Sequence, residues 1–110
     1  MAAAARGAED KLGQDTIVLD VGDVLAITGY FIVTSGANTR QVKTITEGVE
    51  ESVDKVGGPK PIRVEGLDAL QWVLMDFGGF VVHVFGEEAR QFYALERLWK
   101  DVPRVEWRQT

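Results

Sequence analysis

Two short apolar runs near the start of the chain have the pattern of buried strands. Residues 16–21 are rich in β-branched side chains and end at Gly22-Asp23. Residues 30–34 follow Gly29 and end at Ser35-Gly36. Both runs are apolar at consecutive positions, which is typical of strands covered on both faces. We therefore predict that both strands lie inside a covered sheet.

After Asn38 the apolar positions change to a helical period. They recur every three or four residues, at Val42, Ile45, Val49, Val53 and Val56. With acidic residues on the other faces, this spacing predicts an amphipathic helix. Asn38 or Thr39 would cap its N-terminus, and the Gly-Gly-Pro sequence at 57–59 would end it. A strand at 61–65 would complete a strand–helix–strand unit, and Pro61 places that strand near a sheet edge.

The second half of the chain predicts a hairpin followed by a helix. Apolar runs at 72–77 and 80–85 flank Gly78-Gly79, which is the pattern of two antiparallel strands joined by a tight turn. A last helix is predicted from Glu87 to Trp99 or Lys100, and Pro103 would end it at the latest. The architecture is therefore predicted to be α/β: a mixed sheet of about five strands with packed helices, the parallel unit first and the hairpin afterwards.

The last helix has two faces for which different surroundings are predicted. At about 100° per residue, one stripe should face the sheet, and it contains Glu88, Phe92, Leu95 and Trp99. Tyr93 lies about 100° round from Phe92, on the flank of Arg90 and Arg97, where it would be exposed or half exposed. Tyrosine with arginine is enriched at protein–protein contacts, although an ordinary solvated helix face is an equal alternative. Trp72 favours the contact, because an indole at the start of the hairpin would need cover from the core or from a partner.

Composition narrows the class of protein. A chain of 110 residues, 45% hydrophobic and 26% charged, fits one soluble globular domain over residues 1–110, with a short N-terminal segment at 1–12 and a C-terminal tail at 103–110. No apolar run approaches the roughly 20 residues of a membrane span, so no membrane role is expected. The N-terminus has neither a signal-peptide nor a transit-peptide pattern, which makes the cytoplasm the default location.

Charge and cysteine content exclude further classes. The net charge of −5, from twelve basic and seventeen acidic residues, argues against direct binding to nucleic acid. If the chain meets a nucleoprotein, we expect it to meet the protein component. Without cysteine there is no disulfide or thiol catalysis, and a metal site would need His83, the lone histidine, and carboxylates alone. We predict no cofactor and no metal.

Three places in the sequence are candidates for catalysis. His83 lies between valines inside a strand, which favours a hydrogen-bonded core or sheet-surface histidine over a general base, with Asp76 across the hairpin as a possible partner. Asp20 and Asp23 are three residues apart at a strand end, whereas alternate residues of a strand would share a face, so a turn is favoured. Ser35 lacks the flanking sequence of a nucleophile elbow. A small metal-dependent nucleotidyltransferase or hydrolase remains the alternative hypothesis.

In their order along the chain, these segments resemble the ribosomal silencing factor family, also called RsfS or Iojap, from about residue 16 to residue 99. The resemblance rests on Ile17-Val18-Leu19-Asp20-Val21, Ile27-Thr28, Tyr30-Phe31-Ile32-Val33-Thr34, Gly36, Arg40-Gln41-Val42, Glu65-Gly66, Trp72-Val73-Leu74-Met75-Asp76-Phe77-Gly78, Val82-His83-Val84-Phe85, Arg90, Tyr93, Leu95-Glu96 and Leu98-Trp99. Each motif alone is weak, and the ordered set is specific.

The resemblance implies a non-enzymatic translation repressor. Members of the family dock on protein L-fourteen of the large ribosomal subunit, where the small subunit would approach, and block subunit joining when nutrients are short. The implied fold is similar to the nucleotidyltransferase architecture without its catalytic acids. The implied contact surface contains Trp72 and Tyr93, with Asp76, His83, Arg90 and Glu96 as neighbours. When free of the ribosome, the protein is a candidate homodimer through the same aromatic flank.

Three features depart from the family pattern. Gly29 stands where relatives usually have aspartate, so whatever that acid does is absent or replaced here. Asn38-Thr39 replace a serine after the turn glycine and can still cap the helix. The N-terminal helix is short and rich in alanine, and the tail extends through Trp107, which would cover the domain, join a dimer or remain free.

Overall fold

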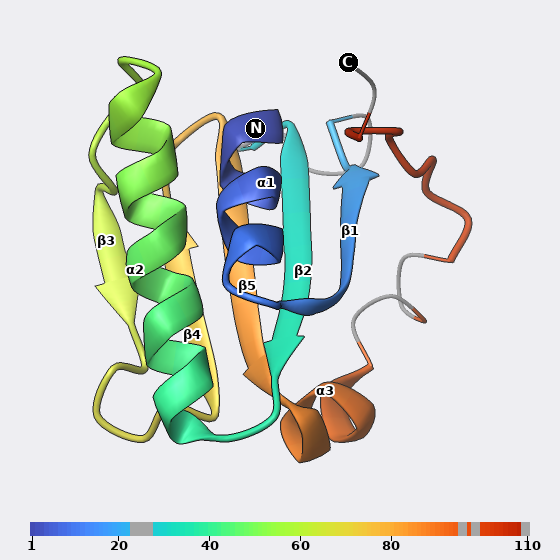
Figure 1. Cartoon of the computed structure of the whole chain (residues 1–110). Helices are drawn as coiled ribbons and strands as arrows, with labels where there is room; N and C mark the ends of the chain where they lie inside the picture. Colours follow the sequence, from blue (N-terminus) through green and yellow to red (C-terminus); the bar gives the residue numbers. More distant parts are fainter. Residues whose placement is uncertain (23–27, 95–96, 98–99, 109–110) are drawn as a thin grey trace.

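A mixed sheet of five strands forms the centre of the molecule (Figure 1). This computed structural model describes residues 1–22, 28–94, 97 and 100–108. Its elements, in chain order, are α1 (Ala2–Asp10), β1 (Gln14–Asp20), β2 (Tyr30–Gly36), α2 (Thr39–Lys55), β3 (Arg63–Glu65), β4 (Trp72–Asp76), β5 (Phe80–Gly86) and α3 (Glu87–Tyr93). The predicted α/β class, with about five strands and packed helices, is confirmed.

The strand order is β1-β2-β5-β4-β3, and only β2 and β5 are parallel neighbours. The strand–helix–strand unit from β2 through α2 to β3 does join strands of the same direction, but β5 and β4 lie between them. The interior strands are β2, β5 and β4. β3 has three residues, of which Arg63 and Glu65 are exposed, and it lies at the sheet edge as Pro61 predicted.

The prediction that both early strands are internal is wrong for β1, which lies at the other edge. Its outer side is covered by the C-terminal segment: the Asp20 amide donates to the Pro103 carbonyl at 2.8 Å, and the Val105 amide donates to the Val18 carbonyl at 2.9 Å. Trp107 follows and is only 5% exposed, with its indole Nε1 3.3 Å from the Thr16 carbonyl oxygen. Trp107 thus covers the domain. The C-terminal segment that carries it also covers β1, which explains why this edge strand is apolar.

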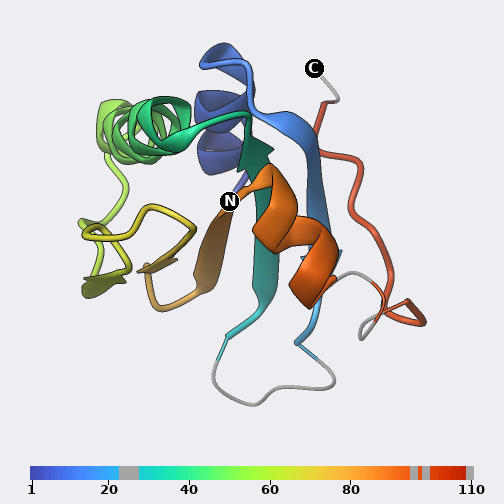
Figure 2. The same ribbon diagram turned by 90° about the horizontal axis from the view of Figure 1, so that it is seen from below.

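Helices α1 and α2 lie together on one face of the sheet (Figure 2). Their contact is close, because a Cβ built on Gly7 would lie 2.6 Å from the Gly48 carbonyl oxygen. Helix α2 begins and ends as predicted. The Asn38 side chain accepts a hydrogen bond from the Gln41 amide at 2.9 Å, and Gly57 closes the C-terminus with a φ of 76°.

The hairpin prediction is confirmed, since β4 and β5 pair antiparallel with Trp72 opposite Phe85 and Asp76 opposite Val81. The prediction of an unbroken last helix is wrong. Helix α3 ends at Tyr93, and Ala94 adopts the left-handed conformation with a φ of 46°. Residues 95, 96, 98 and 99 of that prediction lie outside the described part of the chain.

Candidate functional site

The sheet face opposite α1 and α2 carries most of the predicted contact residues. Among the described residues no second helix layer covers it, and α3 lies only at the end of the sheet that β2 and β5 reach (Figures 1 and 2). Alternation along β2, β4 and β5 places one set of side chains on this side. We call one part of this set the aromatic face: Phe31, Trp72, Leu74, His83 and Phe85 from the strands, with Tyr93 from α3.

Trp72 is the centre of this face. Its ring centroid lies 4.6 Å from that of Tyr93 and 5.0 Å from that of Phe85. Phe85 is fully buried, Trp72 is half-buried, and Tyr93 is 47% exposed. The face therefore passes from a buried ring to an exposed one within a few ångströms, which is the gradient expected where aromatic side chains anchor a partner.

His83 lies beneath Trp72 and is 4% exposed. Its Nδ1 accepts a hydrogen bond from the indole Nε1 of Trp72 at 3.1 Å, which requires a neutral ring with the proton on Nε2. Burial lowers the pKa of His83 to about 4. A histidine in this state is a poor general base near neutral pH. The interpretation as a hydrogen-bonded core histidine is confirmed, and Asp76 as its partner is wrong.

Asp76 lies on the same side of the sheet but at the opposite end of β4 from Trp72. Its carboxylate accepts a hydrogen bond from the Gly78 amide at 2.8 Å and lies 3.9 Å from the Arg63 guanidinium. This hydrogen bond stabilises the hairpin turn, in which Gly78 has a φ of 92°. Asp76 is thus separated from the aromatic cluster while remaining on the same face.

The predicted orientation of the last helix is wrong within α3. Phe92 and Glu88 were expected to face the sheet, yet both are exposed, Phe92 at 81%. Tyr93 packs on the sheet instead. Its exposure is as predicted, since it is half exposed. Helix α3 has seven residues and leaves β5 without a loop, so the strand end sets its rotation rather than its apolar stripe. Phe92 is therefore a surface residue that the sequence did not identify.

Arg90 fixes α3 against the start of β1. Its guanidinium donates to the Gln14 carbonyl at 2.8 Å, to the Asp15 carbonyl at 2.7 Å and to the Ser35 hydroxyl at 3.2 Å. The Arg90 guanidinium thus contacts β1 and Ser35 of β2. Arg97 is exposed. Glu96 lies outside the described residues. Of the six predicted contact residues, Trp72, His83 and Tyr93 are brought into one cluster.

The acids of the catalytic alternative do not form a site in the described part of the chain. The Asp20 carboxylate accepts a hydrogen bond from the Gly22 amide at 3.2 Å, which closes the turn after β1 as predicted. Asp23 lies outside the described residues. Residues 1–22, 28–94, 97 and 100–108 contain no group of three or more His, Cys, Asp or Glu side chains placed to hold a metal ion. None of the helices in these ranges is long and apolar enough to cross a membrane.

Comparisons with known proteins agree on one family. The family model described as "Ribosomal silencing factor during starvation" matches residues 1–110. The chain is 36% identical over 100 residues to "Ribosomal silencing factor RsfS" of Bacillus subtilis, covering 91% of this chain and 84% of that protein. It is 32% identical over 88 residues to mouse "Mitochondrial assembly of ribosomal large subunit protein 1", covering 78% and 39%. A crystal structure of a Chromobacterium violaceum protein superposes with a TM-score of 0.83 at 34% identity, covering 88% and 80%.

Proposed function

The chain belongs to the ribosomal silencing factor family, and from this premise we propose that it represses translation by docking on the large ribosomal subunit and blocking the approach of the small subunit. Membership itself makes the protein a ribosome-associated regulator of translation, and the name of the mouse relative supports the large subunit as partner. The finer proposal is that it contacts protein L-fourteen, acts in the cytoplasm when nutrients are limiting, and catalyses no reaction.

The observation that carries the proposal is the aromatic face. Tyr93 is 47% exposed and Phe92 is 81% exposed beside it, with their ring centroids 5.0 Å apart. Exposed aromatic side chains that are joined to a packed cluster lose little conformational entropy on binding, because their rotamers are already restricted. Trp72 and Tyr93 are the proposed anchors, since tryptophan and tyrosine dominate the energetics of protein–protein contacts.

The other proposed contact residues have supporting roles that follow from their positions. His83 positions Trp72 through the Nδ1–Nε1 hydrogen bond. Asp76 supplies negative charge on the same face of the sheet, which suits a basic ribosomal protein. Glu96 lies outside the described residues, and its contact with the partner is proposed from the family resemblance alone. Arg90 acts by holding α3, and therefore Tyr93, in place.

The proposed mechanism is occlusion. The domain measures 34 × 33 × 27 Å. A folded body of this size, held where the small subunit would dock, excludes that subunit by volume alone. Its sheet ties β4 and β5, which carry Trp72 and His83, into the same body as the two helices on the far face. Repression by this route requires tight docking and no chemical step.

Co-sedimentation with purified large subunits tests the docking surface. We expect Trp72→Ala and Tyr93→Ala each to weaken binding about thirtyfold or more, because truncation of an interface anchor removes about 2 kcal/mol or more. Leu12→Ala is the matched control, since Leu12 is 76% exposed but lies after α1, away from the aromatic face. If both aromatic variants keep native circular dichroism and bind like the wild type, the site assignment is wrong.

We further propose that the free protein pairs with a second copy through the same face. An exposed cluster of Phe92, Tyr93 and Trp72 would then be covered in either state. Sedimentation velocity at several concentrations measures the association. A dimer that persists unchanged in Tyr93→Ala would exclude the aromatic face as its interface.

A further inference from the structure

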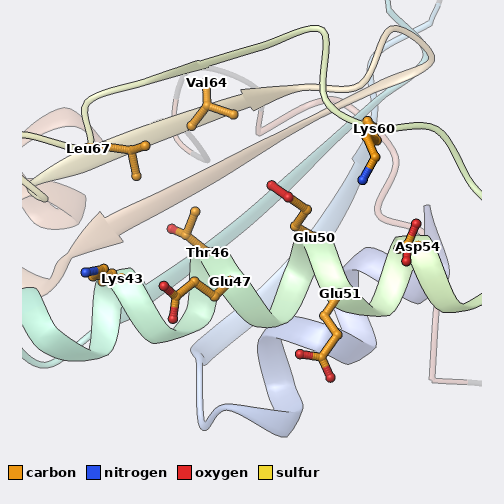
Figure 3. A pocket seen from close by; sticks show the side chains of 9 residues that line it. All are labelled: Lys43, Thr46, Glu47, Glu50, Glu51, Asp54, Lys60, Val64 and Leu67. Carbon is orange, nitrogen blue, oxygen red and sulfur yellow. The ribbon is translucent and has the colours of Figure 1, made fainter.

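A groove on the opposite side of the molecule has no role in the proposed docking. It encloses about 340 Å³ between α2 and the segment that carries β3 (Figure 3). Val64 and Leu67 line it from the β3 side, and Lys60 extends across it toward α2. Helix α2 covers one face of the sheet, and Trp72 lies on the other face. The groove and the aromatic face therefore lie on different sides of the sheet (Figure 2).

The floor of the groove is apolar. Val64 is partly buried against the hydrophobic core, and Leu67 remains 51% exposed. Thr46 projects from α2 toward Val64 (Figure 3), and its hydroxyl donates to the Val42 carbonyl at 2.9 Å. The threonine therefore has its polar atom satisfied within the helix. A ligand that fills this floor gains from apolar contact with Val64 and Leu67.

The rim on the α2 side is acidic. Glu47, Glu50 and Asp54 follow one another at spacings of three and four residues, which places them along one side of the helix. Glu51 also lines the groove, but it already pairs with Lys55 at 3.3 Å. Within the described residues, Glu47, Glu50 and Asp54 have no ion-pair partner within 4 Å, and Lys43 and Lys60 are the basic residues of the lining.

We propose that this groove binds a short basic segment of a protein partner, with an apolar residue of the segment on Val64 and Leu67 and its lysine or arginine side chains on Glu47, Glu50 and Asp54. Charge complementarity selects this occupant. Four carboxylates line the groove against two ammonium groups, so the phosphates of a nucleic acid would be repelled. A second copy of this chain carries a net charge of −5 and is disfavoured for the same reason.

This inference does not depend on the proposed docking through Trp72. A partner on the groove leaves the aromatic face open, so one molecule is able to hold both contacts. Binding at two separate surfaces would raise the overall affinity for an assembly that carries both ligands. The two proposals therefore fail independently, and peptide binding by Trp72→Ala separates them.

The test uses a fluorescein-labelled peptide, Lys-Leu-Arg-Lys-Leu-Lys, with both ends blocked, and fluorescence anisotropy at 150 mM salt. The groove variant is Glu47→Gln with Glu50→Gln and Asp54→Asn. The control variant is Asp10→Asn with Glu88→Gln and Asp101→Asn, which changes the net charge equally outside the groove. We expect the groove variant to weaken peptide binding about tenfold and the control variant less than about twofold. Leu67→Ser should also weaken it several-fold.

Several outcomes would overturn the proposal. Equal weakening by both triple variants means that only net charge matters. Absence of peptide binding to the wild-type protein removes the proposed occupant. Binding of an oligouridylate at the groove, or a dimer that only the groove variant disrupts, assigns the surface to nucleic acid or to a second copy. Peptide binding retained in Trp72→Ala is expected, and its loss there would place the peptide on the aromatic face instead.

Discussion

The indole Nε1 of Trp72 donates a hydrogen bond of 3.1 Å to Nδ1 of His83, and this bond crosses from β4 to β5 on the aromatic face. His83 is buried and Trp72 is half-buried, so the bond joins the interior of the sheet to the proposed contact surface. The Phe31 ring of β2 makes a T-shaped contact with His83, with ring centroids 4.6 Å apart. Three strands thereby restrict the position of one indole ring.

The first prediction concerns the pH dependence of stability. The folded-state pKa of His83 is about 4 and its ordinary value is 6.5, so between these pH values the unfolded chain binds a proton that the folded protein does not. The stability that the neutral, buried His83 contributes is fully present above about pH 6.5 and is lost as the pH falls toward 4. When the pH falls from 7 to 5, the free energy of unfolding measured in urea should decrease by about 2 kcal/mol more in the wild type than in His83→Gln. Equal losses would contradict the assignment.

The second prediction concerns the energy of the Trp72–His83 bond. A double-mutant cycle with Trp72→Phe and His83→Phe keeps aromatic rings at both positions while removing donor and acceptor. We expect a coupling free energy of unfolding of about 1 kcal/mol. The single variant His83→Phe should also bind large subunits more weakly, although it retains Trp72. A coupling near zero would mean that His83 does not position the indole.

The third prediction separates two phenylalanines of the same region. Phe85 is fully buried, so Phe85→Ala should lower the free energy of unfolding by about 3–5 kcal/mol. Phe92 is 81% exposed, and Phe92→Ala should change it by no more than about 0.5 kcal/mol. Phe92→Ala should nevertheless weaken binding to large subunits. Strong destabilisation by Phe92→Ala would restore the orientation that the apolar stripe predicted.

The fourth prediction concerns Arg90. Lysine cannot reproduce the fork of hydrogen bonds to the Gln14 and Asp15 carbonyls, so Arg90→Lys should lower the free energy of unfolding by about 1–3 kcal/mol. Amide hydrogen exchange in α3 should become faster. Arg40→Lys, at an exposed position of α2, is the control. Unchanged exchange in α3 would show that Arg90 does not hold the helix.

Local features of the fold were predictable because each has its own signal in the sequence. The spacing of Val42, Ile45, Val49 and Val53 defined α2, and Asn38 caps it as an oxygen acceptor should. Gly78-Gly79 between two apolar runs gave the β4–β5 hairpin. In these cases residues close in sequence determine the structure, so periodicity and turn chemistry were sufficient.

The strand order and the edges were not predictable, because distant residues decide them. β1 is apolar like an internal strand, but the neighbour on its outer side is the segment around Pro103 and Val105. Nothing in that segment has the pattern of a strand. Likewise, the sequence predicts a strand at 61–65 directly after α2. It does not predict that β5 and β4 lie between that strand and β2.

The site was predictable in its members more than in its geometry. Trp72 and Tyr93 were named from composition and position, and the structure brings their rings to 4.6 Å. The partner of His83 was missed, because a hydrogen bond between rings on neighbouring strands depends on register rather than on spacing. The helical period places Phe92 on the stripe that faces the sheet, and this prediction is wrong because a seven-residue helix is oriented by its attachment to β5 and by Arg90.

Occlusion through the aromatic face is tested by the joining of purified ribosomal subunits, followed by light scattering. We expect wild-type protein to lower the amplitude of joining in proportion to the large subunits it occupies. Trp72→Ala, at a concentration where the wild type is saturating, should leave joining near the protein-free level. Undiminished joining when wild-type protein saturates the large subunits, or equal inhibition by Trp72→Ala, would contradict occlusion through the aromatic face.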